Sequence, residues 1–260
     1  MKLLLSIGLA ACLFMTLPVS AFSIEPLKIG VADEPYPPFT WKEPDGKWKG
    51  FEIDLSMAIC AAIKRQCVTV NTRWDGLIEA LTTKKIDMIM SSMVITDERR
   101  KVIDFTIPYY STGAAFMGSR GSVLVLTRDG MKGKTVGVQD STTHAADVQS
   151  KFGDVATIRT YPTQEEANDD LVAKHVDVVF ADKVALAEFL KEPQASGLAI
   201  LADVPPGERG VTKVGAGLRK EDKALTGEVN TAIATLLANG DYDRLAKPYF
   251  DFDIYGLPRK

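Results

Sequence analysis

Charged and hydroxyl side chains follow several predicted strands of this chain, and their chemistry suits a small zwitterion. Arg99 carries a planar guanidinium that can hold a carboxylate through two parallel hydrogen bonds. Residues 141–143 (Ser-Thr-Thr) lie where a strand turns into a helix, so they offer hydroxyls and free N–H groups. Asp182 ends a later strand and could hold an ammonium group, while Tyr36 and Trp74 could line a side-chain pocket. Together these groups could bind an amino acid.

The same residues show little sign of catalysis. Ser141 and His144 are close in sequence, but no acidic partner stands out to orient the histidine, and His175 is expected at the surface. No zinc-protease, phosphate-loop or dinucleotide motif occurs. Two cysteines without a nearby histidine make a poor metal site. We therefore expect a binding protein rather than an enzyme, with no metal and no cofactor.

Alternating strands and helices provide the scaffold for these side chains. Apolar strands are predicted at residues 28–32 and 87–90 and a β-branched strand at 68–70, with helices at 55–63 and 77–81. This order is typical of a parallel sheet. A second unit has predicted strands at 135–138 and 176–180 and helices at 143–151, 163–174 and 185–190. Thr163 and Glu166 form a capping box where the middle helix begins.

The two units contain one repeated pattern. Residues 81–92 (LTTKKIDMIMSS) align without gaps with residues 171–182 (LVAKHVDVVFAD). The alignment places Ser91 and Ser92 where Ala181 and Asp182 stand, just beyond a buried strand, which is where open α/β sheets bind ligands. Chance similarity of two helix-to-strand turns is the alternative. If the repeat is real, two facing lobes would set hydroxyls opposite a carboxylate.

The C-terminal part is expected to return to the first lobe, through a strand at 214–218 and a helix that stops at Asn239-Gly240. The chain would then cross between lobes at 103–112 and 202–210, where Pro205-Pro206-Gly207 lies. We predict an α/β fold with residues 22–110 and 204–260 in one lobe and 111–203 in the other. Two crossings would form a hinge that closes around a ligand.

Residues 1–21 resemble a secretory signal: one lysine, an apolar run and Val19-Ser20-Ala21 as a signal-peptidase site. We expect cleavage near Ala21 and an exported protein; a lipoprotein signal at Cys12 and a retained anchor are alternatives. Cleavage leaves Cys60 and Cys67. In an oxidising compartment such a pair favours one disulfide, with two free thiols as the alternative.

Composition agrees with a folded, soluble chain. Of its 260 residues, 46% are hydrophobic and 25% are charged, which excludes a disordered or collagen-like chain. The net charge of -3 argues against non-specific binding of nucleic acid, which needs clustered Lys and Arg.

An ordered series of motifs resembles the family-3 solute-binding proteins of ABC transporters, over nearly the whole mature chain. The motifs are YPPF (36–39), GFEIDL (50–55), WDGLIEAL (74–81), IMSSMVITDERR (89–100), IDFTIPYY (103–110), VGVQDSTT (136–143), GLRKED (217–222) and YFDFDIYG (249–256). The likeness is greatest to the lysine/arginine/ornithine- and histidine-binding branch, with opine-binding proteins nearby. That branch shares the paired cysteines.

The resemblance implies a two-lobed periplasmic-binding-protein fold of type II, with two hinge crossings and a ligand cleft between the lobes. It implies a monomer in the periplasm that delivers an amino acid to an ABC permease in the inner membrane. By position, Arg99 would hold the ligand α-carboxylate, helped by Thr142 and neighbouring amides such as that of Thr143. Asp182 and the carbonyl of Ser92 would hold the α-ammonium.

The resemblance also implies the lining of the side-chain pocket. Tyr36 and Trp74 would stack on the ligand side chain. Asp33, Ser91 and Ser141 would line its distal end, where Asp33 could meet a cation. Glu34, beside Asp33, would also suit a cationic ligand, but we expect it to be solvated.

The chain departs from the family near the pocket. Val94 stands where the family often has Ser, Thr or Ala, so a hydroxyl contact would be lost while the backbone amide remains. The loop between Val138 and Ser141 is one residue shorter than in the basic-amino-acid binders, and the segment 31–36 is one residue longer. The sequence therefore leaves the ligand open: a polar, basic amino acid or an opine-like derivative.

Two other classes of protein remain as alternatives. Some relatives on this fold resemble periplasmic dehydratases that act on prephenate or arogenate, which would need a catalytic acid in the cleft. A detached sensor module is the third interpretation, but the chain shows neither a later membrane span nor a signalling domain.

Overall fold

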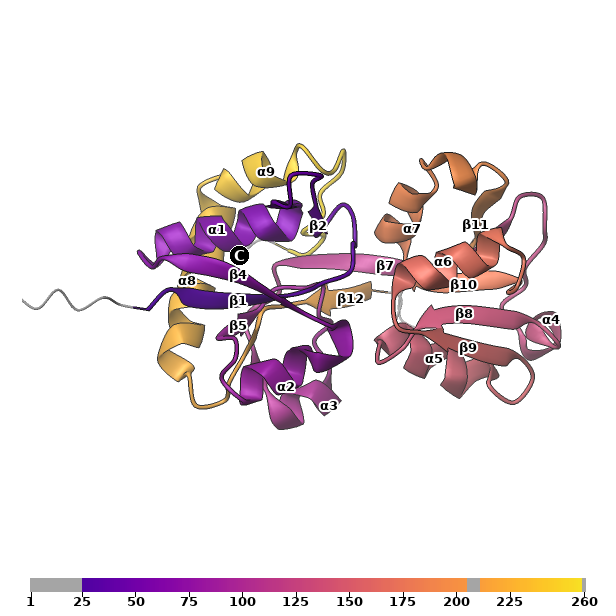
Figure 1. Ribbon diagram of the computed structural model, residues 1–260, viewed down its shortest axis with the longest axis horizontal. Helices are drawn as coiled ribbons and strands as arrows, with labels where there is room; N and C mark the ends of the chain where they lie inside the picture. Colours follow the sequence, from indigo (N-terminus) through magenta and orange to yellow (C-terminus); the bar gives the residue numbers. More distant parts are fainter. Residues whose placement is uncertain (1–24, 205–210, 259–260) are drawn as a thin grey trace, which may run out of the picture.

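The computed structural model describes residues 25–204 and 211–258. The predicted signal sequence and the part of the predicted crossing at 202–210 that contains Pro205-Pro206-Gly207 lie outside these residues. The chain forms two lobes that lie side by side along the long axis of the molecule (Figure 1). Each lobe has its own sheet with helices packed on both faces.

The lobe on the left of Figure 1 contains the first sheet. Its strands are β1 (Leu27–Ala32), β4 (Cys67–Thr72), β5 (Met88–Ile89), β6 (Asp104–Phe105) and β13 (Gly217–Leu218). They run in the order β4-β1-β5-β13-β6. Because β1 pairs in parallel with both β4 and β5, the predicted parallel unit is confirmed.

Helices surround this sheet, and a short hairpin lies beside it. The helices are α1 (Phe51–Ala62), the 3-10 turn η1 (Trp74–Gly76), α2 (Leu77–Thr82), α3 (Asp97–Val102), α8 (Lys223–Ala238) and α9 (Asp241–Ala246). The hairpin consists of β2 (Trp41–Lys42) and β3 (Trp48–Lys49). Gly240 has φ +80°, so it ends α8 in the left-handed conformation that glycine tolerates, as predicted.

The second lobe contains the larger sheet. Its strands are β7 (Tyr110–Ser119), β8 (Thr135–Gln139), β9 (Thr157–Tyr161), β10 (Val178–Asp182), β11 (Leu198–Asp203) and β12 (Val211–Val214). The order is β11-β7-β10-β8-β9, and β12 pairs with β7. The helices are α4 (Arg128–Met131), α5 (Thr143–Phe152), α6 (Gln164–Val172), α7 (Lys183–Phe189) and the 3-10 turn η2 (Pro193–Ala195). The Thr163 hydroxyl accepts a hydrogen bond from the Glu166 N–H, as the capping motif predicts.

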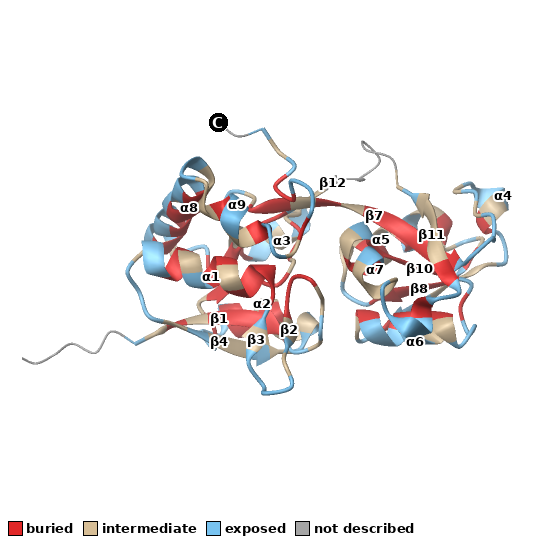
Figure 2. Cartoon of the chain, turned by 90° about the horizontal axis from the view of Figure 1, so that it is seen from above, coloured by how far each residue is buried: buried red, intermediate tan, exposed pale blue. Residues whose placement is uncertain are grey.

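Burial explains the continuous apolar run of β10. Val179 and Ala181 belong to one buried cluster of the second lobe, whereas Val178 and Phe180 belong to another. Successive side chains of a strand point to opposite faces, so both faces of β10 are covered. Figure 2 shows the buried strands between their helices. The carboxyl end of β10 therefore has a fixed position, which matters for Asp182.

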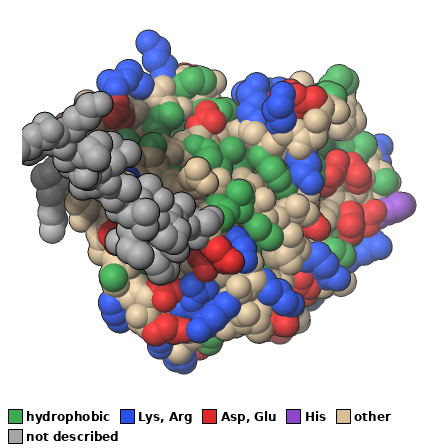
Figure 3. All heavy atoms as spheres, turned by 60° about the vertical axis from the view of Figure 1, so that its left-hand side comes forward, with side chains coloured by type: hydrophobic (Ala, Val, Ile, Leu, Met, Phe, Trp, Pro, Cys, Tyr) green, Lys and Arg blue, Asp and Glu red, His purple; other side chains and the backbone are tan. Residues whose placement is uncertain are grey.

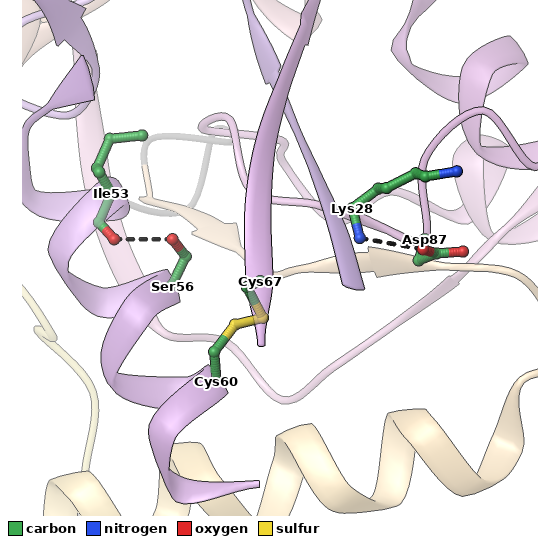
Figure 4. Close-up of a disulfide and its surroundings, with 6 residues drawn as sticks. All are labelled: Lys28, Ile53, Ser56, Cys60, Cys67 and Asp87. Carbon is green, nitrogen blue, oxygen red and sulfur yellow. Dashed lines mark hydrogen bonds between the residues drawn. A yellow bond between two sulfur atoms is a disulfide. The ribbon is translucent and has the colours of Figure 1, made fainter. Parts of the chain in front are cut away.

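The repeated pattern of the two units is a repeated structure. Lys84 and Lys174 both have a positive φ, of 63° and 62° respectively. The Asp87 carboxylate accepts from the Lys28 N–H at 3.0 Å, as Figure 4 shows. The Asp177 carboxylate accepts from the Thr135 N–H at 2.7 Å in the same way. Identical Lys and Asp thus make the same turn into β5 and into β10.

A disulfide joins Cys60, near the end of α1, to Cys67, the first residue of β4 (Figure 4). It closes the turn that follows α1. The predicted pairing is confirmed, and the alternative of two free thiols is wrong.

The lobes are joined by the paired strands β7 and β12, which register Val211 against Gly113 and Val214 against Tyr110. The C-terminal segment then returns to the first sheet, because β13 pairs with β5 and β6. The predicted strand at 214–218 is in fact two strands, with Val214 ending β12 and Gly217 beginning β13. The exact lobe boundaries stay a prediction.

The surface carries charges of both signs. On the face shown in Figure 3, basic and acidic side chains lie next to each other over the described part. Within residues 25–204 and 211–258, no helix combines the length and apolarity needed to cross a membrane.

Candidate functional site

A pocket lies between the two lobes, at the carboxyl ends of strands from both sheets. Its lining consists of Ala32, Glu34, Tyr36, Trp74, Ser91, Ser92, Val94, Arg99, Gln139, Thr142, Thr143, His144, Gln164 and Asp182. Nine of the eleven residues singled out in the sequence are in this lining. Asp33 is exposed and does not line the pocket. Ser141 is outside the lining too, but its carbonyl contacts two residues that belong to it.

Arg99 is the cation of the first lobe. It lies in the first turn of α3, whose N-cap Thr96 accepts from the Arg99 N–H at 3.1 Å. The guanidinium donates to the Val94 carbonyl at 2.8 Å and lies 5.4 Å above the centre of the Trp74 ring. Burial lowers the pKa of Arg99 to about 10. Among the described residues we find no carboxylate paired with Arg99, so its charge is available to an anion.

The serine pair of the first lobe is fixed by hydrogen bonds. The Ser91 hydroxyl accepts from the Ala32 N–H at 2.9 Å, which joins the ends of β1 and β5. Ser92 has φ +53°, an uncommon backbone conformation for a residue with a side chain. The buried Glu52 carboxylate accepts from the Ser92 N–H and hydroxyl and from the Tyr109 hydroxyl. Burial raises the pKa of Glu52 to about 7.

The start of α5 brings backbone donors from the second lobe. The Thr142 hydroxyl caps this helix by accepting from the Ala145 N–H at 3.1 Å, and it donates to the Gln139 carbonyl at 2.7 Å. The hydroxyl proton is thus already used. The first N–H groups of a helix have no intrahelical partner, so those of Thr143 and His144 remain as donors. The predicted anion site therefore consists of amides more than of hydroxyls.

Asp182 is the anion of the second lobe. It is 3% exposed at the end of β10, and one carboxylate oxygen accepts from the Tyr36 hydroxyl at 2.8 Å. The other oxygen, Oδ1, is buried and has no hydrogen-bond partner. Burial raises the pKa of Asp182, while the nearby His144 and the Tyr36 hydroxyl oppose this shift. A buried carboxylate with a free oxygen is suited to an ammonium group.

His144 has an acidic neighbour after all. Its Nε2 lies 3.7 Å from Asp182 Oδ1, and this nitrogen is buried and has no hydrogen-bond partner either. The expectation that no acid stands near His144 is therefore wrong. The acid comes from β10, far away in sequence, and both groups face the pocket.

Glu34, not Asp33, turns into the pocket. Its carboxylate accepts from the Gln139 side-chain N–H at 2.8 Å. Burial raises the pKa of Glu34 to about 7. The expectation of a solvated Glu34 is wrong, because this side chain lines the pocket while its neighbour Asp33 is exposed.

Several lining residues were missed as candidates: Ala32, Glu34, Gln139, His144 and Gln164. These residues end or follow strands β1, β8 and β9. Ligands of open α/β sheets bind beyond the carboxyl ends of strands, and this principle, which indicated Asp182, could have indicated them as well. Within the described ranges, no group of three or more His, Cys, Asp or Glu could hold a metal ion.

Four hydrogen bonds cross between the lobes at this pocket. Tyr36 donates to Asp182, and Gln139 donates to Glu34, both at 2.8 Å. The Trp74 indole N–H and the Arg99 guanidinium both donate to the Ser141 carbonyl, at 3.3 and 3.2 Å. The pocket is therefore enclosed from both sides by side chains that already contact the opposite lobe.

Comparison with known proteins gives consistent matches. A family model for bacterial extracellular solute-binding proteins, family 3, matches residues 27–252. The L-arginine-binding protein of Pseudomonas aeruginosa is 41% identical over 263 residues, covering 98% of this chain and 99% of that protein. The histidine-binding periplasmic protein of Salmonella typhimurium is 38% identical over 262 residues, covering 97% and 98%.

A solved structure shows the same architecture. An ancestral arginine-binding protein bound to arginine has a TM-score of 0.80 and 30% identity with this chain. The match covers 86% of this chain and 97% of the other. The two-lobed fold predicted from the sequence is thereby confirmed.

Proposed function

The chain belongs to the bacterial extracellular solute-binding proteins of family 3, and from its pocket we propose that it captures a cationic amino acid in the periplasm for an ABC importer. Arginine, lysine, ornithine and histidine are the candidate ligands, and an opine-like derivative is the less favoured one. Relatives that are named for binding arginine and histidine support the class of ligand.

One observation carries this proposal: among the described residues, a guanidinium with no carboxylate partner and a carboxylate with one free oxygen line the same pocket from opposite lobes. Arg99 comes from the first lobe and Asp182 from the second. The ligand α-carboxylate would accept hydrogen bonds from the Arg99 guanidinium and from the free N–H groups at the start of α5. The ligand α-ammonium would donate a hydrogen bond to Asp182 Oδ1, which has no hydrogen-bond partner in the structure. An amino acid satisfies both ends at once.

The preference for a cation rests on Glu34. A carboxyl group with its pKa raised to about 7 by burial gains stability from a cation that keeps it ionised. Gln139 holds the Glu34 carboxylate in place from the second lobe. A guanidinium or ammonium at the end of the ligand side chain would supply the missing positive charge.

Closure of the lobes follows from the same contacts. A ligand that touches Arg99 and Asp182 together has a higher affinity for the closed arrangement, so it shifts the population towards that arrangement. The paired strands β7 and β12 provide the connection about which the lobes would move. We also propose that residues 1–21 are removed on export and that the protein is a monomer.

Calorimetry with a ligand panel tests the proposal. Arginine, lysine, ornithine and histidine should bind more tightly than citrulline and glutamine, which lack a cationic side chain, by at least about tenfold. Equal affinity for arginine and citrulline would overturn the cationic preference. Failure of every amino acid and opine to bind would overturn the proposed function itself.

We propose binding without turnover. The enzyme alternative was a dehydratase acting on prephenate or arogenate, and prephenate carries no ammonium group that Asp182 Oδ1 could hold. Incubation with prephenate and with arogenate, followed by measurement of the aromatic product, tests this point. If more product forms than in a protein-free control, the protein is an enzyme and the proposal of binding without turnover is overturned.

A further inference from the structure

His144 and Asp182 form a pair of buried polar groups that are close but not bonded. His144 Nε2 and Asp182 Oδ1 are 3.7 Å apart, beyond hydrogen-bond distance, and neither atom has another hydrogen-bond partner. Both residues are more than nine-tenths buried and both line the pocket. Buried polar atoms in folded proteins nearly always have partners, so two that face one pocket indicate a shared ligand group.

The position of His144 restricts its charge. It is in the first turn of α5, where the positive end of the helix dipole disfavours an imidazolium. Its ring meets the ring of Phe180 edge to face, with 5.1 Å between centroids and 88° between planes, so the ring has a fixed orientation. Asp182 favours the imidazolium instead. His144 Nε2 is therefore held beside Asp182 Oδ1, where one ligand group can reach both atoms.

Charged groups from each neighbouring element surround the pair. Asp182 lies on β10, and the Tyr36 hydroxyl from the loop after β1 donates to its other oxygen. Arg99 on α3 and Glu34 line the same pocket. Glu52 on α1 lies behind Tyr36 and acts on it through its charge. A ligand ammonium would be the cation placed nearest to both His144 and Asp182.

We propose that the neutral ring of His144 is a second acceptor for the α-ammonium of the ligand, beside Asp182. The proposal rests on the proposed function, because it concerns the same amino-acid site. An ammonium and an imidazolium at one buried carboxylate repel each other. Any proton that the His144 ring carries at low pH must therefore leave for the solvent on binding, so that the neutral Nε2 can accept a hydrogen bond from the ammonium. Capture weakens as the pH falls.

Nuclear magnetic resonance tests the proton step directly. The chain has two histidines, so two imidazoles titrate, and each can be assigned with the variants His144→Gln and His175→Gln. His175 is largely exposed and pairs with Asp170, far from the lining, so it is the internal control. Saturating L-arginine should lower the titration midpoint of His144 by at least about one pH unit and leave His175 unchanged.

Calorimetry of variants tests the acceptor role. In buffers of different ionisation enthalpy, the wild-type protein and His175→Gln should release a proton on binding L-arginine near pH 6. His144→Gln and His144→Ala should release less. His144→Gln, whose amide oxygen can still accept a hydrogen bond, should bind more tightly at pH 8 than His144→Ala, by at least about threefold.

The outcomes separate this inference from the proposed function. If arginine binds but the midpoint of His144 is unchanged or rises, the proton-coupled role is overturned and the amino-acid site stands. Equal affinities of His144→Ala and the wild-type protein at pH 8 would overturn the acceptor role. Absence of binding by any amino acid at pH 8 would overturn both.

Discussion

The Glu52 carboxylate, at the start of α1, holds the backbone of Ser92 at the edge of the pocket. It accepts from the Ser92 N–H at 2.7 and 3.0 Å and from the Ser92 hydroxyl at 3.0 Å. Ser92 has φ +53°, a conformation that costs a residue with a side chain about 1–2 kcal/mol. Glu52 thus stabilises the loop that would direct the Ser92 carbonyl towards a ligand ammonium.

Glu52 should make folding stability depend on pH. Burial raises its pKa in the folded protein from the ordinary 4.5 to about 7. Between these values the folded state binds a proton that the unfolded state lacks, so stability falls as the pH rises through this window. The loss is roughly 2–3 kcal/mol between pH 5 and pH 8.

The variant Glu52→Gln removes this dependence. Urea unfolding at pH 5 and pH 8 should show the variant gaining roughly 2–3 kcal/mol relative to the wild-type protein over that range. Glu34 titrates in both proteins, so its contribution cancels from the comparison. Parallel stability curves for the two proteins would show that Glu52 is ionised in the fold at both pH values.

Much of the fold could be predicted from periodicity and repetition. The apolar runs predicted β1, β5, β8 and β10, because buried strands need continuous apolar residues, and β-branched residues predicted β4. The repeat predicted that Asp182 and Ser92 occupy equivalent places. The strand at 214–218 was predicted as one unit because an apolar run does not reveal where a chain leaves one sheet for another; in the structure Val214 belongs to β12 and Gly217 to β13.

The site was predictable in its positions but not in its orientations. The positions of Arg99 and Asp182 were predicted from the ends of strands. Asp33 and Glu34, however, are adjacent acids in one loop, and no periodicity decides which of the two side chains faces the pocket. The partner of His144 lies on a different element, so local sequence could not reveal it. Glu52 stood out only as one letter of the motif GFEIDL (50–55), because a single buried acid leaves no pattern.

Arg99→Ala should weaken binding of L-arginine by at least about 2 kcal/mol, or about thirtyfold, because the ligand carboxylate loses its charge partner. Arg100 is the matched control, since it lies next to Arg99 on α3 but faces Asp104 at 3.8 Å, outside the pocket lining. Calorimetry should show Arg100→Ala within about threefold of the wild-type affinity. Equal losses in both variants would assign the effect to α3 as a whole.

Asp182→Asn should separate stability from binding. Burial is the main cause of the raised pKa of Asp182, so the ionised carboxylate costs folding free energy that an amide does not. We expect an unfolding temperature at least equal to that of the wild-type protein, together with a loss of arginine affinity of at least about 2 kcal/mol. Asp203→Asn, on an exposed residue paired with Lys183, is the control. Unchanged affinity in Asp182→Asn would remove this residue from the site.

The disulfide should contribute to stability without affecting the ligand. Loop-closure entropy for the short loop between Cys60 and Cys67 corresponds to about 2.5 kcal/mol. The double variant Cys60→Ser with Cys67→Ser should lose about that amount in urea unfolding, while arginine affinity stays within about twofold, because neither residue lines the pocket. A large loss of affinity would instead indicate that the end of α1 positions the site.

Glu34→Gln and Asp33→Asn decide which acid recognises the ligand side chain. Glu34 lies in the pocket beside Gln139, whereas Asp33 is exposed. Arginine and citrulline share the same α-amino end, so the ratio of their affinities isolates the side-chain end from Arg99, Asp182 and His144. Because a cation favours the ionised form of Glu34, whose pKa is about 7, this ratio should rise from pH 6 to pH 8 in the wild-type protein. It should stay nearly constant and close to one in Glu34→Gln. In Asp33→Asn the ratio should stay well above one, with its rise shifted to lower pH, because Asp33 contributes to the raised pKa of Glu34. The reverse result, with the ratio lost in Asp33→Asn, would place the recognising carboxylate in the loop position that the family resemblance implied.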